Sequence, residues 1–291
     1  MRTKTTLLLF SVLLAACSND TGSSTTTLTL GMAGLEDLGP DYVYEGWLIV
    51  DGAPVTAGRF TVDADGNATP DAFEIDSATA EAATTYVLTI EPATGDDPAP
   101  SDVHILAGDL SGGTASLGAG HPAAIATDFS SAAGQFILET PSSGADADDY
   151  ANGIWWLVPG ADGMAPGLDL PELPAGWTYE GWVVGPDGPI STGTFDAADM
   201  ADSDGAGADA GPDMTPPFPG QDFVDPAQTL TGGYMAVISV EPVPDNSPAP
   251  FTIKPLADMS IEDVMAPMTQ PMSNIASDTL PGGSVSLGLG N

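Results

Sequence analysis

Short runs in which apolar and polar residues alternate follow one another along the first part of the chain. Leu28 and Leu30 alternate with threonines, and the run at 84–91 places its tyrosine, leucine and isoleucine on one face. The predicted strands cover residues 27–30, 42–50, 55–62, 73–75, 84–91, 103–106 and 114–117. Short strands separated by Gly, Pro and Asp predict an antiparallel sandwich.

The motif Tyr-Glu-Gly-Trp occurs twice, and the rest of the pattern is arranged around it. It runs from Tyr44 to Trp47 and again from Tyr179 to Trp182, and the strand that follows each motif is repeated as well. A repeated position marks a strand or turn that the same fold uses twice, so these four aromatic residues are predicted to be structural. The sequence therefore predicts an all-β chain of two tandem antiparallel β-sandwich (Ig-like) units from an internal duplication.

The second copy is longer than the first. The segment at 110–118 returns at 280–288, at a larger offset than the Tyr-Glu-Gly-Trp motif, so residues have been inserted between them. The predicted units are a signal peptide at 1–16, a tether at 17–27, copy one at 28–127, and copy two at 128–291 with insertions at 196–227 (acidic, a surface loop) and 254–277 (Met-rich).

Two features do not follow the simple alternating pattern. The apolar run at 154–158 has no match in copy one, and we expect an extra strand that seals one unit against the other. Trp155 and Trp156 face opposite sides of that strand, so at least one of them is expected to be exposed and available for sugar or protein contact. Glu45 and Glu180 interrupt apolar strands, either facing solvent or forming hydrogen bonds with a neighbouring strand inside.

The N-terminus has the pattern of a bacterial export signal. A short basic start is followed by an apolar run at 7–14, too short for a membrane span, and then by Ala-Ala-Cys. This ending resembles a lipobox, which implies that Cys17, the single cysteine of the chain, carries the lipid. Ser18 after it implies transport to the outer membrane where the cell has one. We expect a lipid-anchored extracytoplasmic protein of the cell envelope whose membrane contact is this lipid.

The charge is strongly one-sided. The chain has 41 Asp and Glu against 4 Lys and Arg, a formal net charge of −37, and 42% hydrophobic residues, so a folded protein with an acidic surface is predicted. After removal of the signal peptide, Arg59 and Lys254 are the remaining Lys and Arg residues. Such a surface argues against nucleic acid as a partner. It indicates a salty habitat, where repulsion is screened, or calcium binding by clustered carboxylates.

Two groups of residues are candidate metal ligands. The acidic turn after the strand at 55–62 has carboxylates at alternate positions, as calcium loops do, but its glycine is fourth and no glutamate is twelfth, so it is not an EF-hand. A hairpin turn and a solvated loop are the alternatives. The candidate calcium ligands are Asp63, Asp65 and Asn67 in copy one and Asp199, Asp202 and Asp204 in copy two.

The Met-rich insertion offers a second chemistry. Met265, Met268 and Met272 could hold Cu(I), which prefers thioether ligands, in an extracytoplasmic setting. The alternative is a short helix, capped near Ser260, whose methionines pack on the sandwich.

The repeated motifs resemble a known family. Tyr-x-x-Trp followed by branched residues, a small-residue-Gly-x-Phe strand, and a strand that ends in Glu-Pro before Pro-Ala-Pro are similar to the extracytoplasmic domain of anti-sigma-K-type factors. The similarity covers residues 28–120 and 135–288 and implies a β-sandwich. Such factors also have a cytoplasmic sigma-binding region and a membrane span, which this chain lacks. The resemblance therefore does not carry sigma binding over to this protein.

The function expected from the sequence is a non-catalytic binding or structural module that contacts an unknown protein or glycan. No Ser-His-Asp order, P-loop or dinucleotide fingerprint is present, so no enzyme is predicted. No cofactor is expected beyond possible Ca²⁺. The alternative is a surface lipoprotein that handles Ca²⁺ or Cu(I).

Overall fold

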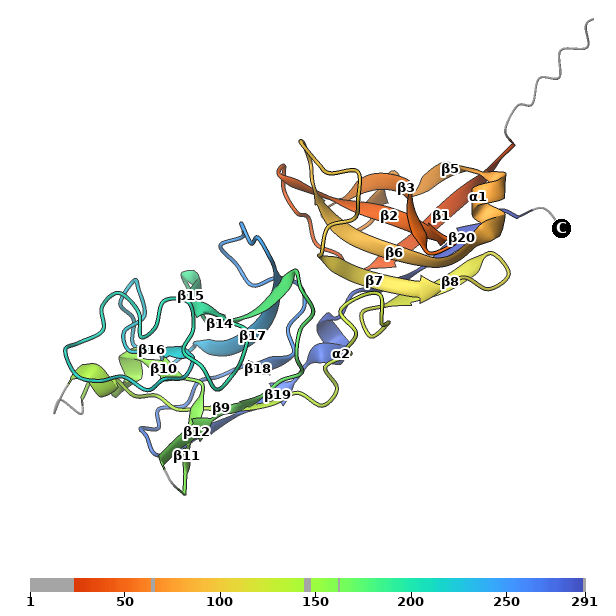
Figure 1. Cartoon of the computed structure of the whole chain (residues 1–291). Coiled ribbons are helices and arrows are strands. Elements are labelled where there is room, and N and C mark those ends of the chain that lie inside the picture. The colour runs from red at the N-terminus through yellow and green to blue at the C-terminus, as the bar shows by residue number, and fades with distance from the viewer. Residues whose placement is uncertain (1–23, 64–65, 144–147, 162, 290–291) are drawn as a thin grey trace, which may run out of the picture.

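The structure is a computed structural model that describes residues 24–63, 66–143, 148–161 and 163–289. Two curled antiparallel sheets dominate it (Figure 1), so the predicted all-β class is confirmed. The short helices are α1 (Ser77–Ala82), α2 (Ala276–Thr279) and the 3-10 turns η1 (Pro141–Ser143) and η2 (Tyr150–Asn152). No helix within these described residues is long and apolar enough to cross a membrane.

The first sheet contains nine strands in the order β4-β3-β2-β6-β7-β8-β20-β1-β5. The alternating and β-branched runs of the sequence form these strands almost as predicted. Their bounds are β1 (Thr25–Ala33), β2 (Tyr42–Val50), β3 (Ala53–Val62), β4 (Ala68–Thr69), β5 (Ala72–Asp76), β6 (Ala83–Pro92), β7 (His104–Asp109), β8 (Thr114–Gly118) and β20 (Gly282–Leu287).

The second sheet contains seven strands in the order β13-β9-β19-β18-β17-β14-β15, and two small ladders, β10-β16 and β11-β12, lie beside it. Its strands are β9 (Ala133–Phe136), β13 (Leu168–Asp169), β14 (Trp177–Gly185), β15 (Gly188–Phe195), β17 (Met235–Pro242), β18 (Leu256–Asp258) and β19 (Gln270–Asn274). The ladders are formed by β10 (Ile154–Trp155), β11 (Leu157–Gly160), β12 (Gly163–Pro166) and β16 (Gly220–Gln221).

The two Tyr-Glu-Gly-Trp motifs occupy equivalent strands, β2 and β14. Each lies between its hairpin partner (β3 or β15) and the strand that ends in Glu-Pro (β6 or β17), and each hairpin has a bulge beside the motif glycine. The tyrosine hydroxyls of Tyr44 and Tyr179 donate to the carbonyls of Glu36 and Pro171, each eight residues earlier, at 2.8 and 2.6 Å. The local structure of the two motifs is therefore the same, which is what a duplication predicts.

The last strand of the chain lies in the first sheet. β20 pairs with β1 and with β8, although by sequence it is the second-copy counterpart of β8. The chain thus returns from the second sheet to the first before it ends, as its blue colour in Figure 1 shows. Sequence repeats and sheets therefore do not coincide at this strand, and the division at residues 127 and 128 stays a prediction.

The run at 154–158 does not seal one unit against the other. It forms β10 and the start of β11, which Figure 1 places at the end of the second sheet away from the first. Trp155 and Trp156 do enter different apolar clusters, but they are 1% and 0% exposed, so the expected exposed tryptophan is wrong. The acidic insertion explains this, because part of it is buried and Asp222 accepts a hydrogen bond from Trp155 Nε1 at 3.1 Å.

The core lies mainly on one face of each sheet. Tyr44 and Tyr179 belong to the large central cluster and stack on Phe60 and Phe195, with ring centroids 5.5 and 5.7 Å apart. Trp47 and Trp182 are buried in two smaller clusters. The tryptophans therefore lie in the interior, as predicted, and their indole N–H groups require partners there.

Candidate functional site

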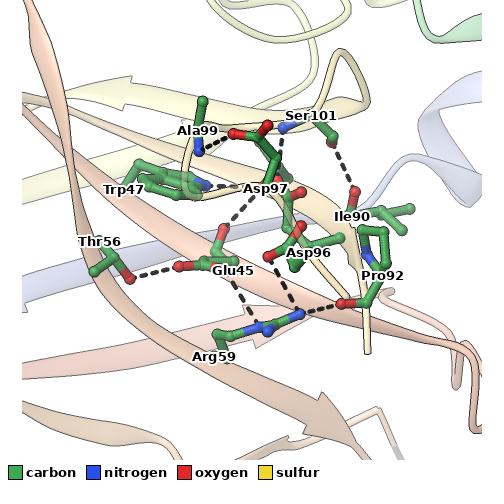
Figure 2. A network of polar contacts seen from close by, with 12 residues as sticks. Glu45, Trp47, Thr56, Arg59, Ile90, Pro92, Asp96, Asp97, Ala99 and Ser101 are labelled. Carbon is green, nitrogen blue, oxygen red and sulfur yellow. Dashed lines mark hydrogen bonds and ion pairs between the residues drawn. The ribbon is translucent and has the colours of Figure 1, made fainter. Parts of the chain in front are cut away.

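An ion pair between a buried carboxylate and a partly exposed arginine lies directly beside the first motif. Glu45 on β2 is 5% exposed and stands opposite Arg59 on β3 in the strand register. The Arg59 Nε lies 3.3 Å from Glu45 Oε2, and the Thr56 hydroxyl donates to Glu45 Oε1 at 2.5 Å. Arg59 also forms an ion pair with Asp96, at 3.5 Å, and its Nη2 donates to the Pro92 carbonyl (Figure 2). One guanidinium thus neutralises two carboxylates.

A chain of hydrogen bonds connects the same region to the tryptophan. Trp47 Nε1 donates to the Thr89 hydroxyl at 2.9 Å, and that hydroxyl donates to Glu91 Oε1. The Ser101 backbone N–H donates to the same carboxylate oxygen at 2.9 Å. Burial raises the pKa of Glu91 above its ordinary value, and these donors oppose the rise. We call Glu45, Arg59, Glu91 and Asp96 the first carboxylate cluster.

The second motif repeats almost every one of these contacts. Ser191 donates to Glu180 Oε1, and Trp182 Nε1 donates to the Ser239 hydroxyl at 2.8 Å. Ser239 donates to Glu241 Oε1, which also accepts the Phe251 N–H at 2.9 Å. The hydroxyl, indole and backbone donors are therefore conserved between the two motifs.

The cation is not repeated. The residue opposite Glu180 in the strand register is Thr194, where the first cluster has Arg59. A third carboxylate, Asp245, is present here as Asp96 is in the first cluster, and one oxygen from each of Glu180, Glu241 and Asp245 lies within 4.8 Å of the others. We call these three residues the second carboxylate cluster.

The electrostatic consequence is a set of high carboxylate pKa values. Burial, together with the nearby carboxylates, raises the pKa of Glu180 to about 7 and that of Glu241 to about 8. Partial desolvation also raises the pKa of Asp245. The Oε2 atoms of both glutamates are buried and have no hydrogen-bond partner.

A cavity of about 640 Å³ lies between loops of the two sheets. Its acidic lining comes from both halves of the chain and contains no basic side chain. The pKa of Glu36 is raised to about 7, chiefly by burial. Asp245 belongs both to the second cluster and to the cavity wall. The five acidic lining residues are Glu36, Asp37, Asp41, Asp102 and Asp245.

The structure places the predicted calcium ligands apart from this site. Asp63 accepts hydrogen bonds from the backbone and side-chain N–H groups of Asn67, at 2.9 and 3.2 Å, which is the geometry of the hairpin-turn alternative. Asp65 lies outside the described residues, as does the lipidation candidate Cys17.

In copy two, Asp199 is exposed and Asp202 is buried. Asp202 accepts the Gly220 N–H at 2.8 Å, and burial, with the neighbouring Asp204 charge, raises its pKa to about 8. Within the part of the chain that the structure describes, the second carboxylate cluster is the place where three His, Cys, Asp or Glu side chains come close enough to hold a metal ion. It includes none of the predicted ligands.

The three candidate Cu(I) ligands, Met265, Met268 and Met272, lie in different environments. Met272 on β19 is 9% exposed and packs in the core against Gly134, whereas Met265 and Met268 are exposed in the preceding loop. The helix that was the alternative to a Cu(I) site is not present, since residues 259–269 form no helix. Pro267 and Pro271 lack N–H groups and disfavour one.

Sequence reasoning singled out Glu45 and Glu180 but missed Glu241 and Asp245. The alternative in which both motif glutamates form hydrogen bonds inside is the one the structure shows. The missed signal lay in the repeat itself: the Arg59 position carries Thr194 in copy two, so one buried glutamate loses its cation.

Comparison with known protein families finds a match in the first part of the chain. The family model "Anti-sigma-K factor rskA, C-terminal" matches residues 18–103, which is less than half of the chain. No curated protein and no solved structure matches. Over this first part, which contains the first motif and its carboxylate cluster, the chain carries a domain similar to the C-terminal domain of anti-sigma-K factors.

Proposed function

We propose that this protein is a lipid-anchored module outside the cell that binds a protein or glycan and catalyses no reaction. The domain match, the all-β fold and the cavity between the two sheets support this function. The cavity carries the proposal, because corresponding loops of both halves form it and its volume is in the range of ligand sites, roughly 300–1,000 Å³.

The lining of the cavity restricts its ligand. Apolar side chains of Ile90, Val103 and Phe251 lie beside the five carboxylates. A ligand with an apolar body and cationic or neutral polar groups fits such a lining, whereas nucleic acid and other anions are repelled. The partly exposed Tyr42 offers aromatic surface to a sugar ring or an apolar side chain.

Sigma binding is not part of the proposal. In the family that the chain resembles, the sigma-binding region lies in the cytoplasm, on the other side of a membrane span. A chain held outside the membrane through a lipid on Cys17 has no access to a sigma factor. The resemblance therefore supports the β-sheet architecture of the module. The expected partner is inferred from the residues that line the cavity.

Binding in the cavity is tested with a short lysine-rich peptide by fluorescence anisotropy. At about 1 M salt the Debye length is about 3 Å, so diffuse attraction to the acidic surface is screened. We expect the double change Asp41→Asn and Asp102→Asn to weaken binding more than the matched control, Asp209→Asn and Asp213→Asn, outside the cavity. Equal weakening in both pairs would assign binding to the general charge of the surface.

Anchoring is tested by labelling cells with a radioactive fatty acid. We expect label on the wild type and on the Ser18→Ala control, and none on Cys17→Ala. Labelled Cys17→Ala protein would contradict the lipid anchor.

A further inference from the structure

We propose that Glu180, Glu241 and Asp245 bind one calcium ion, which occupies the place that the Arg59 guanidinium has in the first cluster. The proposal does not depend on the function proposed above. It concerns residues other than the acidic loops that the sequence suggested as metal ligands.

The two clusters are equivalent in structure. Glu45 and Glu180 lie in equivalent strands, each accepts a hydrogen bond from a hydroxyl in its hairpin partner strand, and each lies near a tryptophan that donates to a buried hydroxyl. Their direct partners across the hairpin are Arg59 and Thr194. The site of a positive charge in one half is therefore a site without a protein cation in the other.

Two of the carboxylate oxygens in the second cluster are buried without a partner. Glu180 is 6% exposed and Glu241 is 0% exposed, and each has a buried Oε2 without a hydrogen-bond partner. An unpaired buried carboxylate oxygen is costly, so it requires a proton or a cation. Because one oxygen from each residue lies within 4.8 Å of the others, a single ion can contact all three.

Across the residues that the structure describes, no protein cation pairs with Glu180, Glu241 or Asp245. Lys254 is the nearest candidate, because its charge interacts with Glu241, but its Nζ donates to the Phe251 carbonyl at 2.6 Å. Among the described residues, Lys254 forms no ion pair with the three carboxylates. Asp204, also nearby, is negative and adds to the repulsion at Glu180.

The chemistry of the donors selects calcium. All three are carboxylates, the ligands that Ca²⁺ accepts in flexible arrangements of six to eight oxygens, with water completing the shell. Asp245 is exposed and lines the cavity, so water and ions have access from that side. Mg²⁺ requires a stricter octahedron, and Zn²⁺ is more often bound by nitrogen and sulfur.

Protons are the competing occupants. A carboxylate binds a metal ion in its deprotonated form, so protons and calcium compete for the same oxygens. Calcium must displace the protons, so its binding releases them and weakens as the pH falls.

The test is calorimetric titration of the purified full-length protein with CaCl₂ at pH 8 and constant ionic strength, repeated in buffers of different ionisation enthalpy. We expect one site with a Kd of roughly 10⁻⁴ to 10⁻³ M, as in extracellular calcium modules, and release of protons. Thr194→Arg, which restores the cation of the first cluster, should abolish binding. Asp209→Asn, outside the cluster and exposed, should leave it unchanged.

Two further measurements guard against misfolding and nonspecific ion effects. Asp245→Asn removes an exposed ligand with little risk to the fold, and it should also abolish the calcium-dependent rise in Tm. MgCl₂ at the same ionic strength should give no comparable rise. Absence of calcium binding by the wild type, or equal binding by Thr194→Arg and Asp245→Asn, would overturn the proposal.

Discussion

The first carboxylate cluster holds three acidic groups and an arginine that pairs with two of them, whereas the second holds three acidic groups and no arginine. They are built on equivalent hairpins, β2–β3 and β14–β15, and each has a hydroxyl donor to the motif glutamate and a hydrogen bond from the motif tryptophan to a buried hydroxyl. The shared contacts belong to the fold, because they satisfy buried polar groups of equivalent strands. The difference at Arg59 and Thr194 is independent of the fold, and it gives the two halves different electrostatic properties.

The largest effect is expected when the first cluster is made like the second by Arg59→Thr. Glu45 then keeps its burial but loses its cation, and Asp96 loses its partner. Breaking a buried pair costs about 3–5 kcal/mol; the half-exposed Arg59 side chain reduces this to about 2–3 kcal/mol. Urea unfolding measures the loss.

The matched control for this change is Arg59→Lys, which keeps the charge without the planar fork and should lose less. Added calcium should restore part of the stability of Arg59→Thr, since the site then resembles the second cluster. A loss of stability below about 0.5 kcal/mol for Arg59→Thr would show that the ion pair contributes no more than an exposed surface pair does.

The next effect is a fall in stability with rising pH that originates in the second cluster. The folded pKa values of Glu180 and Glu241 are about 7 and 8, above the ordinary value of 4.5. The folded state therefore holds more protons than the unfolded state, and the stability present below pH 4.5 is lost as the pH rises through 7 and 8. Without calcium we expect a fall of at least about 1 kcal/mol between pH 5 and 8.

Thermal or urea unfolding in the presence of a chelator measures this slope. Glu241→Gln, which cannot ionise, should flatten it, and Asp209→Asn should not. A slope unchanged by Glu241→Gln would assign the pH dependence to the general acidic surface.

A smaller effect of opposite sign is expected from Thr194→Arg. The new guanidinium lies opposite Glu180, as Arg59 lies opposite Glu45, and it can neutralise Glu180 and Asp245. At pH 8 without calcium we expect a gain of about 1 kcal/mol, since charge-assisted hydrogen bonds contribute about 1.5–3 kcal/mol before the cost of burying the arginine. Thr194→Gln is the neutral control and should give no such gain at pH 8.

How well the sequence predicts these features depends on how far apart in the sequence the interacting residues are. The strand at 42–50 coincides with β2, because alternation, β-branched residues and the following Asp-Gly turn are local signals. The burial of both Trp155 and Trp156 was not predictable in this way, since Asp222 and its neighbours in a distant insertion cover Trp155. β20 likewise joins β1 across almost the whole chain.

The same limit applies to the candidate site. Glu45 and Glu180 stood out because each interrupts an apolar strand, which is a local irregularity. Sheet pairing of β14 with β17 brings Glu241 to Glu180, and the loop after β17 brings Asp245; nothing in their own sequence neighbourhood indicates that contact. With 41 acidic residues in the chain, abundance alone cannot select three of them.

The smallest expected effect is that of calcium on the tryptophan hydrogen bonds that the two halves share. Trp47→Phe and Trp182→Phe each remove an indole donor, at 2.9 Å from Thr89 and 2.8 Å from Ser239. Each change should cost about 1 kcal/mol, the typical net contribution of a buried hydrogen bond, and the two costs should be alike. These indole hydrogen bonds are shared by both halves and do not involve Arg59 or Thr194, where the halves differ. Neither cost should therefore depend on calcium by more than about 0.5 kcal/mol. A calcium-dependent cost for Trp182→Phe alone would show that the relay through Ser239 and Glu241 is part of the ion site, and that the difference between the halves extends beyond Arg59 and Thr194.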